Sequence, residues 1–253
     1  MPVNTAAENI FGTLGAICWT VQLIPQIWKS KRDHSTKGLS PWLVLIWGLS
    51  TAPMGVYCIV KGLSVPLIAQ PHLFGFFSLV SWGQCQYYSQ GRTLFASACM
   101  TLFVISIVAG FEVGMVYALR PSFTQGNKKG VLSFGIMSSV LIAAGLLPQY
   151  YEIYKCNEVL GISMAFMTID ILGGVFSVIS LTFKSDFETL ACIAYSLVIV
   201  LDFVIVVAAF VLNPRAQRRR RQSLQLDSDD VYTTFVPLPS MSSCSRSNSN
   251  NPV

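Results

Sequence analysis

One pattern of residues occurs twice in this chain and restricts its fold more than any other feature. Pro25-Gln26 closes a hydrophobic segment, and Gly38-Leu39-Ser40 opens the next one. The same pattern returns 123 positions later as Pro148-Gln149 and Gly161-Ile162-Ser163. Because the register holds without a gap through a segment, a polar bridge and a second segment, it predicts an internal duplication.

The composition is that of a membrane protein. The chain is 53% hydrophobic and only 11% charged, with a mean hydropathy of +0.56, whereas a soluble domain carries about a quarter charged residues. We therefore expect an all-α integral membrane protein. Crossing a bilayer takes about 20 apolar residues, and the expected transmembrane helices lie near 9–28, 41–61, 66–88, 93–119, 131–153, 162–183 and 187–212.

Seven transmembrane helices also suggest how the two repeats are oriented. Two three-helix units joined directly would face opposite sides of the membrane, and one additional helix restores the same orientation. We therefore expect a 3+1+3 arrangement, in which three-helix repeats at 9–88 and 131–212 are parallel and are joined by a linker helix at 93–119. An N-terminal lumenal segment, 1–8, precedes them, and a disordered cytosolic tail, 213–253, follows.

The distribution of lysine and arginine predicts which loops face the cytosol. Placing the bridge after the first segment and the C-terminal flank inside gives eleven such charges inside and five outside, leaving out Arg246 in the distal tail. We therefore expect a lumenal N-terminus and a cytosolic C-terminus. Lys128 and Lys129, which this arrangement leaves outside, argue the other way.

Pro25, Gln26, Pro148 and Gln149 are candidate hinge residues. Proline lacks an amide hydrogen and clashes with the carbonyl four residues earlier, so it kinks a helix. The glutamine beside it has two donors and one acceptor, which suit the carbonyl that the proline leaves free. A single pair is most simply a tolerated kink, but two pairs at matching positions favour a hinge about which each repeat rocks.

Three carboxyl groups lie within the expected transmembrane helices, on Glu112, Asp170 and Asp202. A charged carboxylate at bilayer depth is costly and usually faces a cavity or a partner. Asp202 lies inside VIVLDFVIVV, where the neutral acid is favoured, so it and Asp170 are candidate proton-coupling residues. Glu112 is closer to the end of its segment, and we interpret it, like the lone His72, as structural.

The helical face around Asp170 is a candidate substrate-binding surface. Small residues follow the acid at i+3, i+4 and i+7, and the equivalent face of the first repeat carries an indole. If the two faces meet, acid and indole together would attract a substrate that bears a cation or an amine. The alternative is helix packing with a protonated acid. The candidate substrate-binding residues are Trp47, Ser50, Thr51, Asp170, Gly173, Gly174 and Ser177.

The two Pro-Gln pairs, each followed by a basic bridge and Gly-x-Ser, resemble the PQ-loop repeat family over about residues 9–212. That family shares its 3+1+3 fold with the SWEET sugar carriers and the cystinosin-like exporters. Asp170 to Ser177 looks like a segment of the cystinosin-like lysosomal exporters, in which the matching acid is tied to proton coupling. Asp202 also matches an acid there. Trp47 and the segment 81–84 are more similar to uncharacterised fungal PQ-loop proteins.

The resemblance implies a proton-coupled transporter that exports a cationic amino acid or cystine from the vacuole or lysosome by alternating access. A non-transporting sorting receptor and a lipid-handling PQ-loop protein of the endomembrane system are the alternatives. Tyr232 and Phe235 resemble an adaptor-binding sorting signal, so the expected partners are an amino acid, protons, the lipid bilayer and a sorting adaptor. No nucleophile–base pair, metal-ligand cluster or phosphate loop is apparent, and we expect neither enzymatic activity, nor a metal or cofactor, nor nucleic-acid binding.

Overall fold

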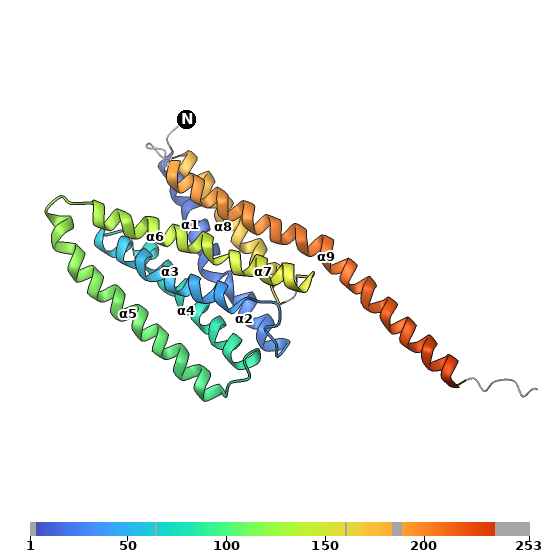
Figure 1. Cartoon of the computed structure of the whole chain (residues 1–253). Helices are drawn as coiled ribbons and strands as arrows, with labels where there is room; N and C mark the ends of the chain where they lie inside the picture. Colours follow the sequence, from blue (N-terminus) through green and yellow to red (C-terminus); the bar gives the residue numbers. More distant parts are fainter. Residues whose placement is uncertain (1–3, 64, 160, 184–188, 236–253) are drawn as a thin grey trace, which may run out of the picture. The chain divides into compact units, whose positions relative to one another are not determined.

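The regular elements of the described chain are α-helices (Figure 1). The computed structural model describes residues 4–63, 65–159, 161–183 and 189–235. The helices are α1 (Thr5–Val21), α2 (Leu23–Arg32), α3 (Pro41–Val60), α4 (Val65–Tyr88), α5 (Leu94–Thr124), α6 (Lys129–Gly145), α7 (Leu147–Cys156), α8 (Met164–Thr182) and α9 (Thr189–Phe235).

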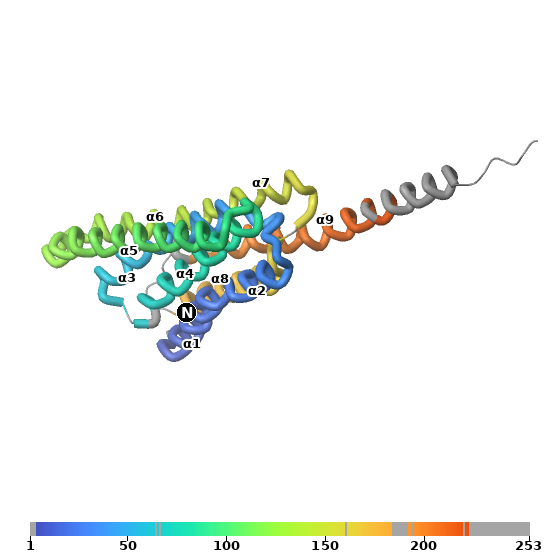
Figure 2. The backbone as a smooth tube through the Cα atoms, turned by 90° about the horizontal axis from the view of Figure 1, so that it is seen from below, coloured from blue at the N-terminus to red at the C-terminus, as the bar shows by residue number. Residues whose placement is uncertain are grey.

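The prolines of the two repeats break the first helix of each repeat into two parts. α1 ends and α2 begins on either side of Gln22, and α6 and α7 meet at Leu146. Proline cannot donate to the carbonyl four residues earlier, so the carbonyls of residues 21 and 144 lose their helical partners. Each break lies beside that carbonyl. Figure 2 shows α2 continuing from α1, and α7 continuing from α6.

Six stretches of the described chain are long and apolar enough to cross a membrane, namely Thr5–Arg32, Pro41–Val60, Leu94–Thr124, Lys129–Cys156, Met164–Thr182 and Tyr195–Arg219. Together they make this an integral membrane protein. The expected third transmembrane helix is present as α4 but is not among the six. Polar residues such as Gln70, His72, Gln84 and Gln86 lower its hydropathy. The 3+1+3 arrangement and the domain limits remain predictions.

The two repeats exchange helix contacts. α1 packs against α8, and α6 packs against α3, so the first helix of each repeat lies along the second helix of the other (Figure 1). α5 packs against α3, α4 and α6. Small residues permit the close approach of α1 and α8, because a Cβ on Gly15 would lie 2.5 Å from Ser177 Oγ and 3.0 Å from the Gly173 carbonyl oxygen. The main hydrophobic core includes Trp47 and Phe166.

The chain forms two compact units, residues 1–213 and 214–253. The structure differs from the expectation of a tail disordered from residue 213, because the backbone of α9 is helical as far as Phe235. Arginine, glutamine and leucine are good helix formers, and adding residues to an existing helix avoids the cost of nucleation. The backbone of Tyr232 is helical, but its side chain and that of Phe235 lie outside the described residues, as do 1–3 and 236–253.

Candidate functional site

The glutamine of each Pro-Gln pair bonds to the other repeat. Gln26 Nε2 donates to the Gly161 carbonyl at 2.8 Å, and its Oε1 accepts from the Ser163 amide at 2.7 Å. Gln149 makes the equivalent pair, donating to the Gly38 carbonyl and accepting from the Ser40 amide, both at 2.8 Å. The expectation that each glutamine pairs with the nearby carbonyl was wrong. We call these four bonds the inter-repeat clamp.

The backbone of the two Gly-x-Ser turns explains why glycine occupies their first position. Gly38 and Gly161 have φ angles of 86° and 74°, in the left-handed region that other L-residues adopt only with strain. The turns also touch each other, because a Cβ on Gly161 would lie 2.5 Å from the Leu39 amide nitrogen and still closer to the Lys37 carbonyl oxygen. The clamp therefore joins two turns that are already in contact.

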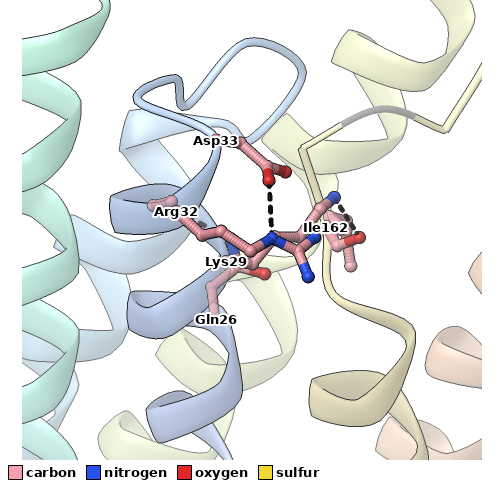
Figure 3. A network of polar contacts seen from close by, with 6 residues as sticks. Gln26, Lys29, Arg32, Asp33 and Ile162 are labelled. Carbon is pink, nitrogen blue, oxygen red and sulfur yellow. Dashed lines mark hydrogen bonds and ion pairs between the residues drawn. The ribbon is translucent and has the colours of Figure 1, made fainter.

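One half of the inter-repeat clamp carries an additional bond. Lys29 Nζ donates to the Ile162 carbonyl at 2.8 Å, between the two residues that Gln26 binds (Figure 3). Arg32 and Asp33 form an exposed ion pair nearby, at 3.0 Å. The repeat places Glu152 at the position equivalent to Lys29. Because a carboxylate cannot donate to a carbonyl, this third bond is specific to the first repeat.

The two acids proposed for proton coupling meet inside the protein. Asp170 of α8 and Asp202 of α9 are 3% and 0% exposed, and their carboxyl groups lie next to each other. Trp19 of α1 and Gln22, which lies between α1 and α2, face the Asp170 carboxyl group. We call these four side chains the acid-pair site. It joins the first helix of one repeat to the second and third helices of the other.

The acid-pair site has more hydrogen-bond acceptors than donors. Four of its oxygens are buried and lack a hydrogen-bond partner among the described residues, namely Gln22 Oε1, Asp170 Oδ2, Asp202 Oδ1 and Asp202 Oδ2. A buried acceptor without a donor costs free energy. Protons on the carboxyl groups, or the N–H groups of a cationic ligand, would supply the missing donors.

The candidate residues of the first repeat have hydrogen-bond partners outside the acid-pair site. Trp47 is 1% exposed, and its Nε1 donates to the Ile142 carbonyl at 2.9 Å. The hydroxyl groups of Ser50 and Thr51 donate to carbonyls of their own helix. All three side chains are therefore satisfied internally, and the indole that the structure places beside Asp170 is that of Trp19, not Trp47.

The small residues after Asp170 make helix contacts. A Cβ on Gly173 would lie 2.6 Å from Trp19 Cδ1, and one on Gly174 would lie 2.6 Å from Ile199 Cγ1. Ser177 Oγ donates to the Gly173 carbonyl. In this structure the three residues let α1 and α9 approach α8, which supports the packing interpretation for them.

Trp19 and Gln22 are not among the residues that the sequence predicts for the site. The signal that identifies them is the spacing of Gly15, Trp19 and Gln22 at i, i+4 and i+7, which places all three on one face of the first helix. That face is the one that packs against α8.

The repeat explains why the acid-pair site has no counterpart at the equivalent positions of the other half of the described chain. The positions equivalent to Asp170, Trp19 and Gln22 are Trp47, Ile142 and Gly145. There the Trp47 indole itself fills the space, bonded to the Ile142 carbonyl and so close to Gly145 that a Cβ would lie 2.6 Å from its ring. One half is thus filled by a tryptophan, and the other holds two acids.

Comparison with known proteins agrees with this architecture. The PQ loop repeat model matches residues 7–67 and 131–190. An uncharacterized protein of Schizosaccharomyces pombe is 32% identical, over 91% of this chain and 80% of its own. An uncharacterized membrane protein of Saccharomyces cerevisiae is 38% identical, over 83% of this chain and 68% of its own.

A further relative of known activity is more distant. The vacuolar histidine transporter YPQ3 of Saccharomyces cerevisiae is 27% identical, over 36% of this chain and 32% of its own. The two family matches coincide with the duplicated segments, and two relatives align over most of the chain. The protein therefore belongs to the PQ-loop repeat family of integral membrane proteins.

Proposed function

We propose that this protein is a proton-coupled transporter that exports an amino acid from the vacuole or lysosome by alternating access. The observation that carries the proposal is the acid-pair site, where two buried carboxyl groups lie together and three of their four oxygens have no donor among the described residues. Membership of a family with a vacuolar histidine transporter among its members supports an amino acid as the substrate and the vacuolar membrane as the location.

The chemistry of the site favours a cationic amino acid. Ammonium, imidazolium and guanidinium groups are donors without acceptors, and they complement the four unpaired oxygens of the acid-pair site. The Trp19 indole beside Asp170 adds a surface that attracts a cation. Cystine, with its two ammonium groups, fits the same argument.

The acid-pair site also provides a physical basis for proton coupling. Two adjacent buried carboxyl groups cannot both be ionised unless a cation lies between them. The pair therefore binds either a proton or a cationic substrate group as its compensating charge, and the two binding events are linked. Gln22 faces Asp170 and lies at the break between α1 and α2, so a change of charge acts directly at the proposed hinge.

The inter-repeat clamp supplies the proposed gate. In parallel repeats both polar bridges lie on the same side of the membrane, and positive charge favours the cytosol for that side. In the proposed cycle the clamp closes the cytosolic side while the lumenal side loads. Rocking about Pro25 and Pro148 then separates the two Gly-x-Ser turns and releases the substrate.

Uptake by the purified protein in liposomes tests this proposal. A radiolabelled panel containing histidine, lysine, arginine and cystine would be supplied with and without an imposed pH gradient. We expect gradient-driven uptake of at least one member and its loss in Asp170→Asn. Asp33→Asn is the matched control, because Asp33 is an acid on the exposed bridge. Uptake absent across the panel, from folded protein, would favour the sorting-receptor or lipid-handling alternatives.

A further inference from the structure

A third carboxyl group inside the helix bundle is paired with a histidine, away from the acid-pair site. Glu112 of α5 is 7% exposed, and its Oε1 lies 2.8 Å from His72 Nε2 of α4. Gly55 of α3 provides the space, because a Cβ there would overlap the Glu112 carboxyl group. The carboxyl group is therefore enclosed by three helices, and His72 is the partner that the structure gives it.

The hydrogen bonds of His72 determine how many protons the pair holds. His72 Nδ1 lies 2.6 Å from the Ile68 carbonyl oxygen, and since a carbonyl only accepts, Nδ1 carries a hydrogen. In the neutral ring Nε2 then has a lone pair, and an ionised Glu112 offers only acceptors. A contact of 2.8 Å between them therefore requires one hydrogen, held either by the imidazolium or by the carboxylic acid.

The neighbouring groups cannot replace that proton. Cys58 of α3 is also close to Glu112, but a thiol is only a weak donor. Lys61, immediately after α3, donates to the Tyr57 hydroxyl oxygen at 2.8 Å. If the proton left, a buried carboxylate would face the lone pair of a neutral imidazole, which costs free energy.

We propose that His72 and Glu112 form a proton-binding site that fastens the linker helix α5 to the first repeat, and that loss of the proton releases this contact. The site has no equivalent in the second repeat, where Tyr195 occupies the position of His72 and Glu112 belongs to the linker. It does not depend on the proposed transport activity, and its test does not measure transport.

The chain contains two histidines, so the pair can be observed directly. Full-length protein with ¹⁵N-labelled histidine would be placed in lipid nanodiscs and its ring signals followed by NMR from acidic to neutral pH. Exposed His34 is the internal reference, and His34→Gln assigns the signals. We expect the His72 signal of the wild type to change with pH. Glu112→Gln should move the change to lower pH, because the neutral amide no longer stabilises the imidazolium. The same titration of His72 in both proteins would overturn the proposal.

Backbone hydrogen exchange tests the release of the contact. The rate of amide exchange depends on pH in any protein, so Glu112→Gln serves as the reference at each pH. At neutral pH the backbone amides of α4 should exchange faster in the wild type than in the variant. At acidic pH the two proteins should exchange at the same rate. Equal exchange throughout would contradict the release.

If Glu112→Gln does not fold, as judged by thermal unfolding, His72→Gln examines the pair from its other side. Infrared difference spectra between acidic and neutral pH should then lose or shift one carboxyl band relative to the wild type. Identical carboxyl bands would contradict a shared proton.

Discussion

Gln26 and Gln149 occupy the same position in the two repeats, and each binds the Gly-x-Ser turn of the repeat to which it does not belong. Both side chains are completely buried. Such a reciprocal arrangement holds the repeats together at one end through four hydrogen bonds. It also explains why glutamine follows proline in both halves, since a carboxylate cannot donate and an apolar side chain can neither donate nor accept.

Replacing one clamp glutamine should destabilise the protein. Gln26→Leu leaves the Gly161 carbonyl and the Ser163 amide without their side-chain partner, and we expect the free energy of unfolding to fall by about 2 kcal/mol or more. Chemical unfolding in detergent micelles would measure it. Gln125→Leu, at an exposed position after α5, is the control. Equal stability of the two variants would contradict the clamp.

The contact between the two turns makes a separate prediction. Gly161→Ala should be more destabilising than Gly62→Ala, although both glycines have positive φ angles of 74° and 65°. A left-handed backbone costs a non-glycine residue about 1–2 kcal/mol at either position. Only Gly161 would place its Cβ against the other turn, whereas the space around Gly62 is open. The difference in unfolding free energy should be about 1–3 kcal/mol, typical of overpacking, and no difference would argue against contact of the turns.

The two acids should act as one unit in transport. Asp170→Asn and Asp202→Asn should each abolish stimulation of uptake by a pH gradient. With one carboxyl group left, the site no longer holds two adjacent acids that together require a proton or a cation. The double variant should then be no worse than either single one, as expected for residues in direct contact. Rates in liposomes with and without the gradient would measure this, and losses that multiply would indicate independent roles.

The two tryptophans should separate binding from packing. Trp19→Phe, beside Asp170, should raise the KM for uptake. Trp47→Phe removes the donor to the Ile142 carbonyl and should lower the unfolding free energy by about 1–3 kcal/mol while leaving the KM unchanged. Uptake kinetics and unfolding curves of the same preparations provide the comparison. The opposite assignment of effects would return Trp47 to the substrate site.

Family membership, the membrane class and the duplicated Pro-Gln motif were predictable from the sequence, because hydropathy and a gapless repeat are local properties of the chain. The predicted hinge prolines coincide with the helix breaks, since the loss of one amide donor acts on a carbonyl only four residues away. The composition of the tail predicted disorder, but in the structure the backbone of α9 is helical as far as Phe235.

The sequence by itself determined the repeat, the buried acids and the positions at which the first helix of each repeat bends. Only the tertiary structure decided which side chains meet. It joined Asp170 to Asp202, Trp19 and Gln22 rather than to Trp47, and it joined each glutamine to the opposite repeat. Periodicity places a residue on a face of its own helix, but its partner depends on how helices far apart in the chain pack. That packing exchanges helices between the two repeats.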